Sequence, residues 1–195
     1  MNRALRVVVA DDTATMQKFY ASLLPKMGHE VVAVAATGAE LVEKCDELKP
    51  DLVITDIKMP DMDGLEAAAK IYEKQPVPII VVSSYSDDEL VQRAAAEHVL
   101  AYLLKPLDVN TLGAQISIVM RRFEEFTILR MEANHYRQSL QDRKLIERAK
   151  GILMRTSKIE EHEAFRRMQK AASRSNKKLV EIAQTIIDAD AALSI

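Results

Sequence analysis

Five short apolar runs alternate with four segments of helical spacing in the first half of the chain, and this alternation constrains the fold more than any other feature. Runs rich in valine and isoleucine favour strands that are buried on both faces. Strands separated by helices of about 10–15 residues form βαβ units, which assemble into a parallel sheet. We predict strands at 4–10, 30–36, 51–56, 78–83 and 100–105, and helices at 15–27, 40–48, 64–74 and 88–97. The first half is therefore expected to be an α/β domain with a doubly wound, five-stranded parallel sheet.

Two carboxylates, Asp11 and Asp12, directly follow the first predicted strand in the stretch VVVADD. Adjacent negative charges repel each other unless water or a cation separates them. Taken alone, the pair favours a solvated turn after a core strand, because aspartate is common in turns. The alternative is a site that holds a cation, and the residues that end the other strands help to decide between the two.

Further polar side chains end the other predicted strands: Asp56 ends the third, Ser83 the fourth, and Lys105 the fifth. The carboxyl ends of parallel strands meet at one edge of a doubly wound sheet, where ligands bind. Three carboxylates at that edge need a hard divalent cation, and oxygen ligands suit Mg²⁺. A lysine and a hydroxyl beside them can bind a phosphoryl oxygen, and an aspartate can itself act as the nucleophile.

Strand signals stop after Asp108, and residues 110–154 contain no proline, which predicts one long helix. Its apolar residues recur mostly at steps of three or four, as in the seam of a coiled coil. The stripe consists of Ile116, Val119, Phe123, Phe126, Leu129, Ala133, Tyr136 and Leu140. A helix folded back on its own domain would also show such a stripe, but its length favours a coiled coil that forms a homodimer.

The rest of the chain has the apolar spacing of two further helices. One face includes Ala164, Phe165, Met168, Ala171 and Ala172, and the other includes Leu179, Ile182, Ala183, Ile186 and Ile187. Together with Leu145, Ala149, Ile152 and Leu153, they predict a small three-helix domain.

Charge is distributed unevenly between the two halves. Residues 1–115 carry 11 basic and 18 acidic side chains, whereas residues 116–195 carry 16 and 11. The excess is concentrated at 137–178, with 13 basic and five acidic side chains. Such asymmetry indicates two modules with different partners. Binding of a polyanion and a merely solvated helical face both fit the basic segment.

Composition excludes several classes of protein. With 195 residues, 48% of them apolar, the chain can bury a core in one large domain or two small ones. The lone cysteine, Cys45, excludes an intramolecular disulfide framework and fits a reducing compartment. No apolar stretch approaches the roughly 20 residues of a membrane helix, and the apolar run at the N-terminus is too short and polar for a signal peptide. We therefore expect a soluble cytoplasmic protein with no membrane partner.

Residues 5–120 resemble the receiver domain of two-component response regulators, which has a flavodoxin-like fold. The resemblance rests on VVVADD, VITDIKMPDMDG, VVSS and AYLLKP, in this order. It implies that a sensor histidine kinase is a partner, that Asp56 accepts a phosphoryl group, and that Mg²⁺ is the cofactor. The implied metal ligands are Asp11, Asp12, Asp56 and the backbone carbonyl of Lys58.

The same resemblance assigns roles to other residues at the predicted edge. Ser83 would bond a phosphoryl oxygen, Lys105 would pair with the phosphate, and Ser83 and Tyr102 would act as the switch. A cis peptide between Lys105 and Pro106 is also implied. Two departures are His98, where receivers usually have glycine, and Lys58, which adds a cation near the acceptor.

Lys144, Arg148, Gly151 and Arg155 fall on one face of the long predicted helix. Glycine inside a helix costs about 1 kcal/mol relative to alanine. Something is therefore expected to come close to the backbone at Gly151, and either a packed helix or a phosphate would do so.

Residues 139–190 resemble the ANTAR domain, an RNA-binding output of transcription antiterminators, through RKLIERAKGILM, EEHEAFRRMQKAA and LVEIAQTII. The resemblance implies binding to stem-loops in nascent RNA. Glu160 departs from the usual Ser or Thr cap. Phe165 is expected in the core, so basic side chains rather than aromatic stacking should carry recognition. The expected RNA contacts are Lys144, Arg148, Lys150, Arg155, Arg174, Lys177 and Lys178.

These features predict a receiver domain at 1–120, a coiled-coil helix at 116–140 and an ANTAR domain at 139–195. The expected protein is a phosphorylation-controlled antiterminator, not an enzyme. Two alternatives are a DNA-binding regulator with a helix-turn-helix output and a protein-interaction adaptor whose basic face only aids solubility.

Overall fold

The computed structural model describes residues 3–84 and 88–193. The chain divides into two compact units, Met1–Thr127 and Ile128–Ile195. The predicted domain ranges also include residues 1–2, 85–87 and 194–195, which lie outside the described residues. Each unit has its own core.

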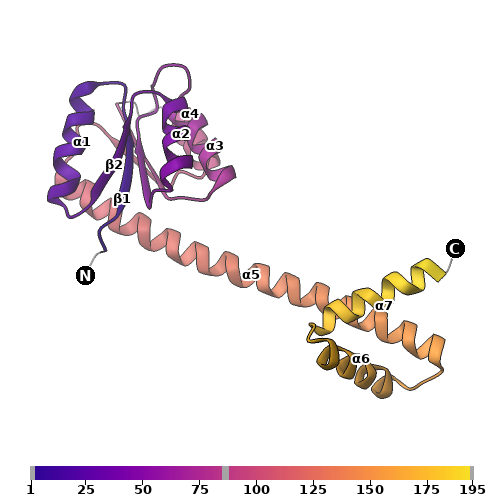
Figure 1. Cartoon of the computed structure of the whole chain (residues 1–195). Helices are drawn as coiled ribbons and strands as arrows, with labels where there is room; N and C mark the ends of the chain where they lie inside the picture. The colour runs from indigo at the N-terminus through magenta and orange to yellow at the C-terminus, as the bar shows by residue number, and fades with distance from the viewer. Residues whose placement is uncertain (1–2, 85–87, 194–195) are drawn as a thin grey trace. The chain divides into compact units, whose positions relative to one another are not determined.

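The first unit is a five-stranded parallel sheet with helices on both faces (Figure 1). Its strand order is β2-β1-β3-β4-β5, so the predicted doubly wound fold is confirmed. The strands are β1 (Arg6–Ala10), β2 (Glu30–Ala35), β3 (Leu52–Thr55), β4 (Ile79–Ser83) and β5 (Ala101–Leu104). The helices are α1 (Ala14–Lys26), α2 (Gly38–Leu48), α3 (Gly64–Lys74) and α4 (Asp88–Ala96), followed by the start of α5 (Val109–Ser157).

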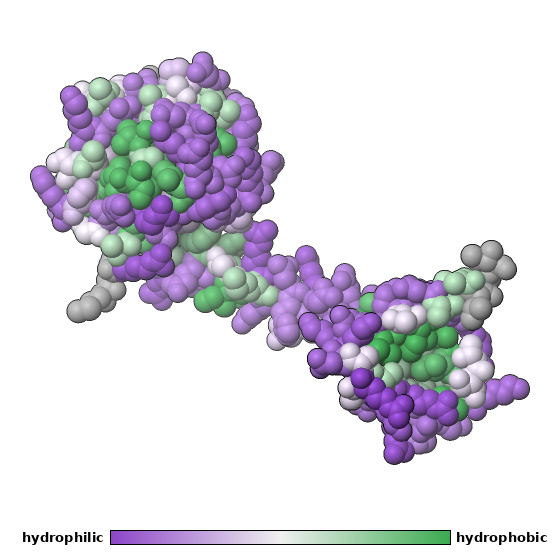
Figure 2. All heavy atoms as spheres, viewed as in Figure 1, coloured by the Kyte–Doolittle hydropathy of each residue, from purple (hydrophilic) through white to green (hydrophobic). Residues whose placement is uncertain are grey.

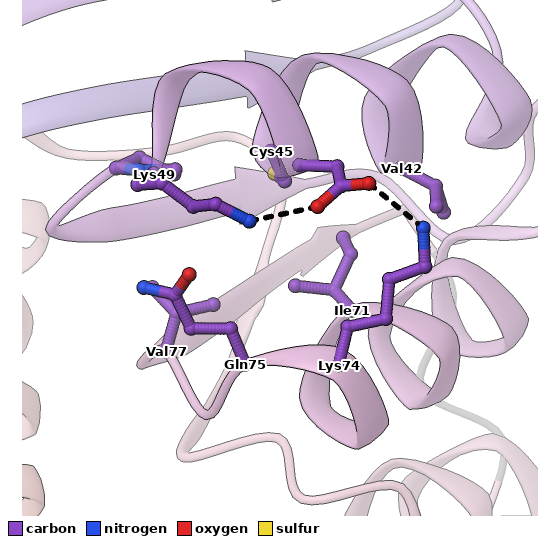
Figure 3. A pocket seen from close by; sticks show the side chains of 9 residues that line it. Val42, Cys45, Lys49, Ile71, Lys74, Gln75 and Val77 are labelled. Atoms are coloured by element: carbon purple, nitrogen blue, oxygen red, sulfur yellow. Dashed lines mark hydrogen bonds and ion pairs between the residues drawn. The ribbon is translucent and has the colours of Figure 1, made fainter.

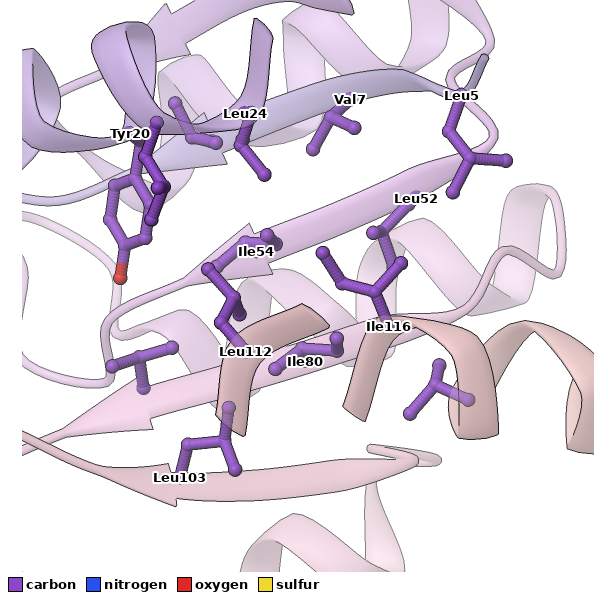
Figure 4. Close-up of a cluster of buried hydrophobic side chains, with 14 residues drawn as sticks. Leu5, Val7, Tyr20, Leu24, Leu52, Ile54, Ile80, Leu103, Leu112 and Ile116 are labelled. Atoms are coloured by element: carbon purple, nitrogen blue, oxygen red, sulfur yellow. The ribbon is translucent and has the colours of Figure 1, made fainter. Parts of the chain in front are cut away.

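Alternation along the strands divides the first unit into two main apolar layers. Val7 and Val9 point to the layer under α1 and α5, whereas Val8 and Ala10 point to the layer under α2 and α3. Figure 4 shows Leu112 and Ile116 of α5 facing Ile54 and Ile80 of the sheet. Because all four of these side chains are buried, the first turns of α5 are part of this core.

This packing corrects part of the predicted coiled-coil stripe. Ile116 and Val119 are buried in the core of the first unit, so they cannot contact a second chain. At these positions the helix folds back on its own domain, which was the alternative interpretation. The exposed part of the stripe begins near Phe123, which is half-buried.

Backbone conformations at three predicted positions bear on the site. Gly28 follows α1 with a φ of 85°, as expected for a left-handed cap. His98 adopts a left-handed φ of 62°, which costs a non-glycine residue about 1 kcal/mol. The His98 ring stacks on Tyr72 at a centroid distance of 3.9 Å, and this contact offsets part of that cost. The peptide between Lys105 and Pro106 is cis, as the resemblance implied.

A small hollow between α2 and α3 contains the lone cysteine (Figure 3). Asp46 bridges Lys49 and Lys74 across its mouth, with oxygen–nitrogen distances of 2.7 and 3.0 Å. Burial raises the pKa of the Cys45 thiol to about 12. A thiol with such a high pKa is a poor nucleophile, so Cys45 fills space in the core.

The second unit packs α6 (Glu161–Ser175) and α7 (Leu179–Leu193) against the last turns of α5. Its buried side chains are Ala149, Ile152, Met168, Ala183 and Ile187. This small all-α arrangement is the predicted three-helix domain. None of the described helices is long and apolar enough to span a membrane.

The middle of α5 exposes several large apolar side chains. Phe126, Leu129, Tyr136 and Leu140 keep 46%, 64%, 69% and 61% of their surface accessible. Figure 2 shows apolar side chains among polar ones at the surface of this helix. These four residues, together with Phe123 and Ala133, are called the α5 stripe below.

Candidate functional site

Three carboxylates meet at the carboxyl edge of the sheet, where the sequence predicted them. Asp11 and Asp12 follow β1, and Asp56 follows the adjacent strand β3. Each offers an oxygen atom, and these atoms lie within 4.8 Å of one another. Asp11 and Asp56 are buried, whereas Asp12 is exposed. Like charges at this distance repel each other unless a cation or water compensates them.

Lys105 supplies such a charge. Its ammonium donates to Asp11 Oδ2 at 2.7 Å and to Asp56 Oδ2 at 2.5 Å. The Lys105 backbone N–H donates to the carbonyl of Ser83, which holds the loop after β5 to the end of β4. Although burial alone would lower it, the hydrogen bonds to Asp11 and Asp56 hold the pKa of Lys105 above its ordinary value. The lysine therefore stays charged and joins the ends of β1 and β3.

The second oxygen of each buried carboxylate is also held. The backbone N–H and the hydroxyl of Thr13 donate to Asp11 Oδ1 at 3.0 and 2.5 Å. The N–H of Ile57 donates to Asp56 Oδ1 at 2.6 Å. Gln17 donates to the Asp11 carbonyl at 2.7 Å. Sequence reasoning missed Thr13 and Gln17, although a hydroxyl two residues after an aspartate is a recognisable turn pattern.

Gly64 lets the loop after β3 close tightly on the predicted phosphoacceptor. A Cβ added at Gly64 would lie 1.8 Å from the backbone oxygen of Asp56, so no other residue fits without moving the loop. Asp63 caps α3 by accepting from Glu66 N at 2.7 Å, and it also pairs with Arg93 of α4 at 2.9 Å. These contacts hold the end of the loop that leads into α3.

The other predicted residues of the pocket lie around this centre. Ser83 is fully buried at the end of β4, and Tyr102 is half-buried on β5 near the cluster under α4. Lys58 is exposed two residues after Asp56. The donor set consists of carboxylate oxygens at the edge of a sheet, and such hard ligands fit Mg²⁺.

The predicted RNA-contacting residues differ in how free they are. Lys144, Arg148, Arg174, Lys177 and Lys178 are exposed, and within residues 3–84 and 88–193 none has an ion-pair partner. Two others are already paired. Arg155 donates to both oxygens of Asp190 at 3.0 Å. Lys150 is 8% exposed and pairs with Glu161 at 2.6 Å and Glu147 at 2.9 Å.

Two expectations for the second unit need correction. Apart from the neighbouring backbone of α5 itself, no described atom lies within 4 Å of a Cβ added at Gly151, which is exposed, so no described helix packs there and only the phosphate alternative stays open. Phe165 is only half-buried and lines a surface hollow, so it is not a pure core residue. Helical spacing could not separate these cases, because core and rim positions of a short helix lie close together on its circumference.

Known proteins match both units. A family model of the response regulator receiver domain matches residues 7–117, and a model of the ANTAR domain matches residues 134–187. The transcriptional regulatory protein PdtaR of Mycobacterium tuberculosis is 38% identical over 183 residues, which are 94% of this chain and 89% of that protein.

Two other matches cover the first unit. A solved CheY-like receiver domain protein from Methanospirillum hungatei is 27% identical to this chain, with a TM-score of 0.60. The match covers 63% of this chain and 98% of that one. A protein-glutamate methylesterase/protein-glutamine glutaminase of Archaeoglobus fulgidus is 35% identical over 66% of this chain, but over only 39% of its own length. A match of this extent carries no enzymatic activity to this chain.

Replacing Lys105 by methionine tests whether the lysine balances the carboxylates. Without metal, the free energy of unfolding of the variant should be about 1–3 kcal/mol lower than that of the wild type. The loss is smaller than for a fully buried ion pair, because 17% of the Lys105 side chain is exposed. Mg²⁺ should restore more stability to the variant than to the wild type, because the metal replaces the lost charge. Urea unfolding in EDTA and in Mg²⁺ measures both effects.

Lys18→Met, an exposed lysine on α1, is the matched control and should change neither quantity. The pKa of Lys105 in the folded protein is raised above the ordinary value of 10.5. The contribution of Lys105 to the free energy of unfolding should therefore be complete below pH 10.5 and disappear as the pH rises through the pKa of the folded state. Equal stabilisation of wild type and variant by Mg²⁺ would contradict the assignment.

Proposed function

The chain belongs to the response regulators that join a receiver domain to an ANTAR domain, and we propose that phosphorylation of Asp56 controls RNA binding by its second unit. As a member of this family it is a two-component response regulator with an RNA-binding output. Four details are proposals: which residue accepts the phosphoryl group, which metal binds, which residues contact RNA, and whether the chain forms a dimer.

The observation that supports Asp56 as the acceptor is its position beside Lys105. Asp56 presents one oxygen to the Lys105 ammonium. It follows β3, which lies beside β1, the strand that ends before Asp11 and Asp12. One Asp56 oxygen would form a bond to phosphorus while the bond from phosphorus to a kinase histidine nitrogen breaks. The electron pair of the broken bond stays on the histidine nitrogen, and a proton taken up from water makes the departing imidazole neutral.

The chain's own groups would position the transferred phosphoryl group. Lys105 would pair with one phosphoryl oxygen, and the Ser83 hydroxyl would bond another. Asp11, Asp12, Asp56 and the Lys58 carbonyl would hold Mg²⁺, which would neutralise charge on the phosphoryl oxygens. Ser83 and Tyr102 would then change conformation as the switch.

RNA contacts are proposed at the unpaired basic residues of the second unit. Lys144 and Arg148 lie on the same face of α5 as the open Gly151, so a phosphate backbone can approach the helix closely there. Arg174, Lys177 and Lys178 extend the basic surface around the end of α6. Lys150 is withdrawn from this set because two glutamates occupy it, and Arg155 contributes less because it pairs with Asp190.

Antitermination is the proposed consequence of that binding, through stem-loops in nascent RNA. Both the histidine kinase and nascent RNA place the proposed action in the cytoplasm. The proposed domain ranges remain 1–120 and 139–195, with the linking helix between them.

A second copy of this chain is the proposed occupant of the α5 stripe. Its members are spaced three or four residues apart, and four of them keep nearly half or more of their surface accessible. A parallel coiled coil would bury that area in a self-complementary seam.

Mass measurement tests the acceptor. After incubation with Mg²⁺ and a small phosphodonor such as acetyl phosphate, the intact wild type should gain one phosphoryl group, whereas Asp56→Asn should gain none because the amide is not nucleophilic. Asp61→Asn, in the same loop and exposed, is the control and should label as the wild type does. Labelling of Asp56→Asn at the wild-type level would rule out this acceptor.

The salt dependence of hairpin binding tests the basic face. Each phosphate contact on single-stranded RNA contributes about 0.7 to the slope of log affinity against log salt, so Lys144→Gln with Arg148→Gln should flatten it by about 1.4. Arg155→Gln should flatten it less, because its pair with Asp190 must first open. Lys18→Gln with Lys26→Gln, on exposed α1 lysines, removes the same charge and should leave the slope unchanged.

The same assay separates the alternatives. Equal competition by duplex DNA would favour a helix-turn-helix output. Absence of affinity for any nucleic acid would favour the protein-interaction adaptor. If the double variant discriminates less well between hairpins while its salt slope changes little, Lys144 or Arg148 reads a base.

Sedimentation tests the dimer. Phe126→Lys with Leu129→Lys places charges in the seam and should convert a dimer to a monomer, with or without the phosphodonor. Ile128→Lys with Met131→Lys is the matched control, because these side chains are 51% and 67% exposed but lie away from the stripe. If both double variants sediment alike, the stripe is not the interface.

A further inference from the structure

The hydroxyl of Tyr20, on α1, is a polar group in the core of the first unit that the proposed phosphoryl transfer does not use. Only 1% of this residue is exposed. Its hydroxyl oxygen is buried and has no hydrogen-bond partner among the described residues. Such a group costs folding free energy, because water bonds it in the unfolded chain. Native structures keep few of them, and each one points to a role that offsets the cost.

The surroundings of the Tyr20 ring offer the hydroxyl no acceptor. The ring lies in the apolar layer under α1 and α5, and the Phe19 ring packs edge-on against it, with ring centres 5.6 Å apart. The other buried side chains of this layer are hydrocarbons, which cannot accept a hydrogen bond. The strand backbone beneath it is paired within the sheet. An acceptor can therefore come only from the edge of the layer.

The acidic pocket lies at that edge. Side chains alternate along a strand, and backbone hydrogen bonds extend β1 and β3 by one residue beyond their ends. Asp11 is therefore on the same side of the sheet as Val9, and Asp56 on the same side as Ile54. Val9 and Ile54 both belong to the layer that contains Tyr20. Figure 4 shows Tyr20 near the arrow ends of the strands, with its hydroxyl pointing away from α1.

The two buried carboxylates act on the phenol electrostatically. Burial raises the pKa of Tyr20, and the negative charges of Asp11 and Asp56 raise it further. The phenol therefore keeps its proton at physiological pH and is available as a donor. Asp11 has the larger effect of the two carboxylates, which indicates that it is the nearer acceptor.

Both Asp11 oxygens already have donors in this structure. Thr13 donates to Oδ1, and the Lys105 ammonium donates to Oδ2. In the proposed phosphoryl transfer Lys105 pairs with a phosphoryl oxygen, so Asp11 Oδ2 loses its donor. A carboxylate oxygen can accept a further hydrogen bond even where it binds a metal ion. Hydrogen bonds to a ligating carboxylate fix its orientation.

We propose that Tyr20 is a positioning residue for phosphoryl transfer, whose hydroxyl donates to Asp11 Oδ2 when the Lys105 ammonium leaves that oxygen for the phosphoryl group. The bond holds Asp11 in place and stabilises only the phosphorylated state. In the resting state the hydroxyl stays unpaired, so the two states differ by one hydrogen bond to a charged group. The proposal rests on the proposed phosphorylation of Asp56.

Tyr20→Phe removes the hydroxyl and keeps the ring, so it tests the proposal in the full chain. Beryllium fluoride with Mg²⁺ is the probe, because it imitates a phosphoryl group on a carboxylate without turnover. Titration calorimetry should show that the variant binds the probe about fivefold to twentyfold more weakly than the wild type, which corresponds to one lost hydrogen bond.

Urea unfolding in EDTA distinguishes this role from a merely structural one. Phenylalanine buries no unpaired hydroxyl, so the unfolding midpoint of the resting variant should equal or exceed that of the wild type. A hydroxyl that only supported the fold would lower this midpoint when removed. Tyr72→Phe, which removes a hydroxyl from the half-buried ring stacked on His98, is the matched control and should bind the probe as the wild type does.

The outcomes separate this inference from the proposed function. If the wild type does not bind beryllium fluoride in Mg²⁺, the proposed phosphorylation of this pocket fails. If the wild type binds it and Tyr20→Phe binds it equally well, the pocket stands and the role of Tyr20 is wrong. A lower urea midpoint of Tyr20→Phe in EDTA would also overturn that role, because the hydroxyl would then have a partner in the resting state.

Discussion

The bridge from Lys105 to Asp11 and Asp56 is the interaction on which the first unit's chemistry depends. Three carboxylates at one edge of a sheet would repel each other, and the lysine makes their proximity possible. The bridge also joins the loop after β5 to the ends of β1 and β3. A group that changes the charge on Asp56 must therefore change what Lys105 contacts. That exchange would be the physical basis of the proposed switch at this site.

Helix α5 contributes to both units of the protein. Its first turns bury Leu112, Ile116 and Val119 under the sheet, and its last turns bury Ala149 and Ile152 in the second unit. Between these cores the helix has no partner among the described residues and exposes the α5 stripe. One continuous element thus carries the acceptor unit's core, the proposed dimer seam and the first helix of the RNA-binding unit.

Pairing within the second unit sorts a basic segment into different roles. Lys150 and Arg155 are held by glutamate and aspartate, so they stabilise contacts between helices. Lys144 and Arg148 have no ion-pair partner among the described residues and lie beside the open Gly151, which suits a phosphate backbone. Phe165 lines a surface hollow beside Lys150.

Local sequence alone determined the sheet, the position of the acidic pocket and the presence of a helical second unit. Short runs rich in valine and isoleucine favour strands, and parallel strands bring Asp11, Asp56 and Lys105 to one edge of the sheet. Only the tertiary structure decided that Ile116 and Val119 pack under the sheet, that Lys150 is paired, and that Gly151 is open while Phe165 lines a hollow. Helical spacing shows which residues share a face but not what covers that face, because the covering groups come from segments distant in the chain.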